Sequence, residues 1–170
     1  MKNKQLDMYL HILASEKEIL SRTDQKAYSL LSLLGLFLIF FIVYYRFIIA
    51  NNVILLLLPF YFLASFLAIW NIISTINPRI HKLPYQEPNN HDIEPTFFGG
   101  IKDFGSPEQY HNYLRELTED EDKTLHLFSQ QIHVFAQLNW VKNANLKRGI
   151  NFFVISVAIE LIMILSTFIF

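Results

Sequence analysis

The stretch "GINFFVISVAIELIMILSTFIF" (residues 149–170) is apolar throughout, except for one acid near its middle, Glu160. About 20 apolar residues in a helix suffice to cross the roughly 30 Å hydrocarbon core of a bilayer. A charged carboxylate at mid-span costs about 2.5–3.5 kcal/mol on insertion scales, so it should face protein or water rather than lipid. The stretch therefore predicts a membrane-spanning helix at residues 150–170 with an inward-facing Glu160.

Two further stretches have the same character and lie close together. "YSLLSLLGLFLIFFIVYY" (residues 28–45) and "VILLLLPFYFLASFLAIWNIIS" (residues 53–74) contain no charged residue. Each is near the length that a spanning helix needs. We therefore predict a tight antiparallel hairpin over residues 28–74, with spans at 28–49 and 53–74.

Composition favours a membrane protein and gives little support to an enzyme. Apolar residues make up 52% of the chain, and the net charge of −1 gives no reason to expect a nucleic acid polymer as partner. The absence of cysteine excludes disulfides, thiol catalysis and thiolate metal sites. No HExxH, GxSxG or Walker motif occurs, and His126 with His133 lacks a third metal ligand. We expect no catalysis, no metal and no cofactor, and a lipid bilayer as one partner.

The distribution of positive charge predicts the orientation. Five Lys or Arg residues lie in residues 1–27 and eight in residues 75–149, whereas the hairpin tip contributes only Arg46. Because Lys and Arg accumulate on the cytoplasmic side, both segments should be cytoplasmic and the carboxyl terminus should lie on the far side of the membrane. No secretory signal is expected, since no small-residue cleavage site follows the first span.

Both cytoplasmic segments contain helical patterns. In residues 1–27, a leucine stripe predicts an amphipathic helix that continues unbroken into the first span. Ser106 should be the N-cap of a helix that has Pro107 at its first position. A longer helix should begin near "TEDEDK" (residues 118–123) and continue into the third span, with Gly149 as a possible joint. Asp24 and Lys26 should point to different sides of their helix and contact separate partners or solvent rather than each other.

The region between these helices has a different composition. Residues 77–105 contain four prolines and three glycines, which are incompatible with one regular helix, yet the region is rich in aromatic residues. We predict an ordered irregular loop packed on the bundle. The fold class is therefore an all-α membrane protein: three transmembrane helices, a cytoplasmic helical layer and an irregular Pro/Gly loop.

Several short blocks follow one another along the chain: "RTDQKAYSLLSLLGLF" (22–37), "NPR" (77–79), "FFGGI" (97–101), "YHNYLREL" (110–117) and "DKTLHLFSQQIHVFAQLNWVKNANLKRG" (122–149). Their succession resembles the Pycsar transmembrane effector family over about residues 15–160. The resemblance implies a bacterial anti-phage effector that responds to a cyclic pyrimidine mononucleotide, cyclic UMP or cyclic CMP, made by a companion cyclase. It also implies that the response impairs the inner membrane and stops growth. The third span departs from the simplest two-span pattern.

For such a ligand, the "FFGGIK" segment (residues 97–102) is the best candidate site. Aromatic faces can stack on a base, glycine-turn amides can approach a phosphate, and a lysine supplies positive charge. The alternative is that the aromatic pair anchors the loop to the bundle and the glycines make a tight turn. We expect the ligand between this loop and the following helix, at Phe97, Phe98, Gly99, Gly100, Lys102, Tyr110 and Tyr113.

The third span carries a second candidate site. Ser156, Glu160, Met163 and Thr167 are spaced four, three and four residues apart, so they share one helical face. Two interpretations remain open: this face packs within the three-helix bundle, or several copies of the chain turn it inward to line a water path. The second requires a homo-oligomer, because three helices cannot enclose a sizeable pore. A different class of function, a non-gated membrane adaptor that docks a cytoplasmic protein, also fits the sequence.

Overall fold

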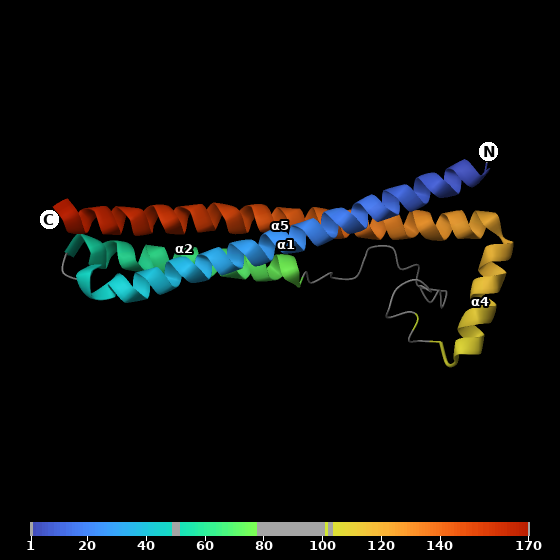
Figure 1. Cartoon of the computed structure of the whole chain (residues 1–170), viewed down its shortest axis with the longest axis horizontal. Helices are drawn as coiled ribbons and strands as arrows, with labels where there is room; N and C mark the ends of the chain where they lie inside the picture. Colours follow the sequence, from blue (N-terminus) through green and yellow to red (C-terminus); the bar gives the residue numbers. More distant parts are fainter. Residues whose placement is uncertain (1, 49–51, 78–100, 102–103, 170) are drawn as a thin grey trace. The chain divides into compact units, whose positions relative to one another are not determined.

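The computed structural model describes residues 2–48, 52–77, 101 and 104–169 (Figure 1). In these residues the regular elements are α-helices and none is a strand, which confirms the predicted all-α class. Three helices are long and apolar enough to cross a membrane, as predicted. The predicted irregular Pro/Gly loop lies almost wholly outside the described residues. The helices are α1 (Lys2–Ile48), α2 (Asn52–Ile76), α4 (Pro107–Glu119) and α5 (Glu121–Ile169).

Two of the helices are much longer than a membrane span. Helix α1 has 47 residues and α5 has 49. At 1.5 Å per residue each is about 70 Å long, more than twice the thickness of a ~30 Å hydrocarbon core. Both continue without interruption from polar sequence into an apolar span, as the sequence predicted.

The chain divides into two compact units. The first, here called the membrane unit, comprises Lys17–Arg79 and Gln137–Phe170, and the second, the flanking unit, comprises Met1–Glu16 and Ile80–Ala136. Helices α1 and α5 each cross the boundary between the two units without a break. The two units are therefore joined by continuous helical backbone at two places.

Local capping explains where the helices of the flanking unit begin. The Ser106 hydroxyl accepts a hydrogen bond from the Gln109 backbone N–H at 3.3 Å, and Pro107 is the first helical residue, as predicted. Asp120 caps α5 in the same way, since its Oδ1 accepts from the Lys123 backbone N–H at 3.2 Å. This hydrogen bond and the Lys123 charge hold the pKa of the Asp120 carboxyl below its ordinary value.

The interior of the membrane unit consists of three apolar layers shared by α1, α2 and α5. Residue numbers rise along α1 and α5 from layer to layer and fall along α2, so α2 is antiparallel to the other two (Figure 1). Helices α1 and α2 thus run in opposite directions, as a hairpin requires. The layers are Ala27, Ile72 and Leu146; Leu34, Ala68 and Phe153; and Phe41, Ile54, Tyr61 and Met163.

Small side chains bring α2 and α5 close together. Lipid tails are as apolar as leucine, so helices associate in a bilayer through close packing and hydrogen bonds rather than through water exclusion. Ala64, Ser65 and Ala68 of α2 are buried, as is Ser156 of α5. The outward faces instead expose large apolar side chains, such as Leu36, Ile42 and Leu165, and these suit a lipid environment.

Gly149 is a contact position within a continuous helix. Helix α5 passes through it without a break, so it does not interrupt the helix as a joint would. A Cβ atom there would lie 2.9 Å from Ile72 Cγ1 and 3.4 Å from the Ile72 backbone nitrogen. At Gly35 of α1, by contrast, a Cβ atom would meet nothing within 4 Å. Packing within the chain therefore requires a glycine at position 149 but not at position 35.

This contrast predicts different responses to the same substitution. Gly149→Leu should destabilise the protein, because overpacking typically costs about 1–3 kcal/mol. The matched variant Gly35→Leu should match or exceed wild-type stability, because leucine favours a helix over glycine by roughly 1 kcal/mol. Thermal unfolding in one detergent, followed by circular dichroism, measures both. Equal stability of the two variants would contradict the close approach of α5 to α2.

Candidate functional site

A buried set of polar side chains lies between α2 and α5, in the middle of the apolar layers. The Ser65 and Ser156 hydroxyls are 2.6 Å apart, and the Tyr61 hydroxyl donates to Glu160 Oε2 at 3.4 Å. All four residues are at least 97% buried. Each helix supplies two residues one turn apart, so the two contacts form successive rungs. We call this set, Tyr61, Ser65, Ser156 and Glu160, the polar ladder.

Glu160 is the most unusual member of the ladder. It is only 2% exposed, and its Oε1 has no hydrogen-bond partner among the described residues. Its surroundings are apolar: Met163 and Phe41 belong to the adjacent layer, and the Phe41 ring stacks on Tyr61 with centroids 4.8 Å apart. The carboxyl group thus faces α2 rather than lipid, and one oxygen remains available for a further polar contact.

The predicted stripe on α5 is therefore partly assembled in a single chain. Ser156, Glu160 and Met163 are all buried against the other helices. Thr167 belongs to α5, but its side chain lies outside the described residues. Sequence reasoning missed Tyr61 and Ser65, the α2 partners. Two polar residues four apart within an apolar span indicate a face that packs on protein. The sequence does not reveal, however, which residues of α5 lie opposite that face.

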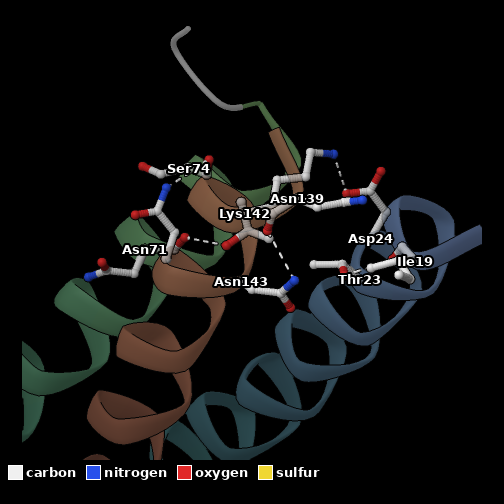
Figure 2. A network of polar contacts seen from close by, with 10 residues as sticks. Ile19, Thr23, Asp24, Asn71, Ser74, Asn139, Lys142 and Asn143 are labelled. Carbon is white, nitrogen blue, oxygen red and sulfur yellow. Dashed lines mark hydrogen bonds and ion pairs between the residues drawn. The ribbon is translucent and has the colours of Figure 1, made fainter. Parts of the chain in front are cut away.

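A second polar cluster contains residues of α1, α2 and α5 (Figure 2). Its central contact joins α1 to α5: Lys142 Nζ lies 2.6 Å from Asp24 Oδ1. The Lys142 side chain is 5% exposed, whereas that of Asp24 is 28% exposed. The neighbouring Asp24 and Lys26 indeed do not pair with each other, as the sequence suggested for residues two apart on a helix.

Further hydrogen bonds surround this ion pair. Within single helices, the Thr23 hydroxyl donates to the Ile19 carbonyl at 2.8 Å, and Asn143 Nδ2 donates to the Asn139 carbonyl at 3.0 Å. Between helices, Asn145 Nδ2 donates to the Ser74 carbonyl of α2 at 3.4 Å. The cluster therefore links all three helices of the membrane unit at one level (Figure 2).

The predicted ligand site is only partly within the described residues. Phe97, Phe98, Gly99, Gly100 and Lys102 lie outside them. Tyr110 and Tyr113 lie on α4, and both rings contact Phe104, with centroids 5.1 and 5.3 Å apart. The structure thus brings the two tyrosines into one aromatic cluster with Phe104, a residue that was not among those predicted for the site.

In the described ranges, no three His, Cys, Asp or Glu side chains are grouped so as to hold a metal ion. The candidate functional groups among the described residues are the polar ladder, the Asp24–Lys142 ion pair with its neighbours, and the aromatic cluster around Phe104. Together with three long apolar helices, they define a multi-pass membrane protein.

Comparison with known families makes the assignment more specific. The family model of the Pycsar effector protein domain (PycTM) matches residues 8–170, nearly the whole chain. The chain belongs to this family, which agrees with the resemblance found in its short sequence blocks. Neither a curated protein nor a solved structure matches it significantly.

Membership defines the broad role of the protein. It is an anti-phage defence effector with a transmembrane role, and its family is not a known family of enzymes. Effectors of this family work with a cyclic nucleotide signal made by a cyclase.

The polar ladder predicts a specific loss of stability. Tyr61→Phe keeps the ring but removes the donor to Glu160, leaving a buried carboxyl group unsatisfied at a cost of about 1–3 kcal/mol. Tyr28→Phe, at a position 55% exposed, is the matched control and should be near wild type. Adding Glu160→Leu to Tyr61→Phe should recover stability, because both partners are then apolar. Thermal unfolding in lipid nanodiscs tests this, and an unchanged Tyr61→Phe variant would contradict the contact.

Proposed function

We propose that this protein senses a cyclic pyrimidine mononucleotide, cyclic UMP or cyclic CMP, made by a companion cyclase, and responds by impairing the bacterial inner membrane. The outcome for the cell is growth arrest or abortive infection. The proposal builds on family membership and on three membrane-spanning helices. The protein acts through binding and rearrangement, without catalysis.

The observation that carries the proposal is the continuity of α1 and α5. Each is a single helix that extends from the flanking unit into the membrane unit. The hydrogen-bonded backbone of a helix resists bending, so a displacement or rotation at one end is transmitted to the other. A ligand that reorganises the flanking unit can thus act on the spans without touching them.

The ligand site of this proposal lies in the flanking unit, between the loop carrying Phe97, Phe98, Gly99, Gly100 and Lys102 and helix α4. The aromatic cluster of Phe104, Tyr110 and Tyr113 supports this assignment, because it offers ring faces for a pyrimidine base. A cyclase product is made in the cytoplasm. The amino terminus and residues 75–149 are therefore assigned to the cytoplasmic side, in agreement with the distribution of Lys and Arg.

The output lies in the membrane unit. In a single chain, Ser156 and Glu160 are covered by α2, so the polar stripe of α5 is closed to water. A rearrangement that separates α5 from α2 would expose these groups together with Met163 and Thr167. In a homo-oligomer, several such stripes facing one another would line a water path across the bilayer.

Depolarisation of bacterial cells tests the function. Cells expressing the wild type should lose membrane potential and stop growing only when cyclic UMP or cyclic CMP is supplied. Glu160→Leu should insert normally yet depolarise weakly, because the stripe loses its carboxyl group. Silence of the wild type with and without nucleotide would favour the non-gated adaptor. Full depolarisation by Glu160→Leu would limit this residue to a packing role.

Calorimetry tests the ligand site. Purified wild type should bind one of the two nucleotides, and Phe98→Ala and Lys102→Ala should each weaken binding. A lost stacking contact of about 1–3 kcal/mol corresponds to roughly 5- to 150-fold in affinity. Trp140→Ala is a suitable control, because this large aromatic residue is 75% exposed in the membrane unit. Unchanged affinity of folded Phe98→Ala and Lys102→Ala variants would remove the loop from the site.

A further inference from the structure

The Asp24–Lys142 ion pair occupies a distinctive place in the chain. It joins α1 to α5 shortly after both helices enter the membrane unit, at Lys17 and Gln137 respectively. Any movement that these two helices carry from the flanking unit reaches this contact before it reaches the apolar layers and the polar ladder. Asp24 precedes Ala27 on α1 and Lys142 precedes Leu146 on α5, so the pair comes just before the first apolar layer along both helices.

The two partners differ in their access to water. The Asp24 side chain is 28% exposed, so its carboxylate can remain hydrated when the contact breaks. The Lys142 side chain is 5% exposed, so its ammonium depends on the protein for compensation. A buried charge left without its partner is strongly unfavourable. The contact can therefore open readily only if α5 moves or turns enough to bring Lys142 into water.

Helix α5 also makes close contacts with α2. These include both rungs of the polar ladder, the hydrogen bond from Asn145 to the Ser74 carbonyl, and the close approach of Gly149 to Ile72. A movement of α5 that exposes Lys142 therefore strains its packing on α2. Breaking the ion pair between α1 and α5 is in this way coupled to loosening of the contacts that cover Glu160.

We propose that the Asp24–Lys142 pair is a latch that holds the membrane unit in its resting arrangement and opens when the effector is activated. The proposal rests on the proposed function for its trigger, but the latch itself is a property of the membrane unit. Weakening it should favour the open arrangement with or without nucleotide. Covalent closure at the same position should prevent opening.

Dye leakage from liposomes containing the full-length protein tests the latch. Asp24→Asn keeps the size of the side chain but removes its charge. It should raise leakage without nucleotide, or lower the cyclic UMP or cyclic CMP concentration for half-maximal leakage about 5- to 150-fold, the usual range of coupling between sites. The exchange Asp24→Lys with Lys142→Asp should return leakage toward the wild type, because it restores opposite charges.

A matched control removes an ion pair that does not join two helices. Arg22 and Glu18 pair within α1 at 2.6 Å, with side chains 69% and 61% exposed. Exposed pairs of this kind contribute little, so Glu18→Gln should leave leakage unchanged. If Asp24→Asn behaves like Glu18→Gln, the latch is overturned.

A second variant keeps the test decisive if Asp24→Asn folds poorly. The chain has no cysteine, so Asp24→Cys with Lys142→Cys introduces the only thiols. Linking them with a short bismaleimide should abolish nucleotide-triggered leakage and suppress any leakage of the unlinked variant. Wild-type leakage from the linked protein would overturn the latch. A wild type that responds to neither nucleotide would contradict the proposed function, while the nucleotide-free leakage of these variants would still decide the latch.

Discussion

A carboxyl group in the middle of a bilayer must find its polar contacts within the protein, because lipid offers none. This constraint acts on Glu160 and favours a rotation of α5 that turns this residue toward α2. With Glu160 turned toward Tyr61, Ser156 one turn earlier meets Ser65, and Met163 joins the apolar layer around Phe41. The outward faces of the three helices are then left with large apolar side chains, which a bilayer accommodates.

The same helices are connected in two different ways. Helices α2 and α5 are joined by small buried residues, hydroxyl and carboxyl contacts, and the close approach at Gly149. Helix α1 contributes to all three apolar layers and meets α5 through the Asp24–Lys142 ion pair. Charged contacts depend on water access, whereas close packing depends on shape. The junction between α1 and α5 is thus the more sensitive to a change in local hydration.

For a member of the Pycsar effector family, this arrangement suggests how a defence signal can reach the bilayer. Two helices of about 70 Å continue from the flanking unit into the membrane unit. The hydroxyl and carboxyl groups of Ser65, Ser156 and Glu160 would be costly to expose to lipid, and they are buried in the interior of the bundle. Under the proposed function, their burial by α2 corresponds to the resting arrangement.

The sequence by itself determined the class, the three spans, the uninterrupted long helices and the cap at Ser106, because apolar length, periodicity and capping act over a few neighbouring residues. It also identified Glu160 as a residue that must face inward. Only the tertiary structure decided its partner Tyr61, 99 residues away, the pairing of Asp24 with Lys142, 118 residues away, and the contact of Gly149 with Ile72. These depend on the rotation and register of whole helices, which are set by the sum of many contacts and leave no local pattern in the chain.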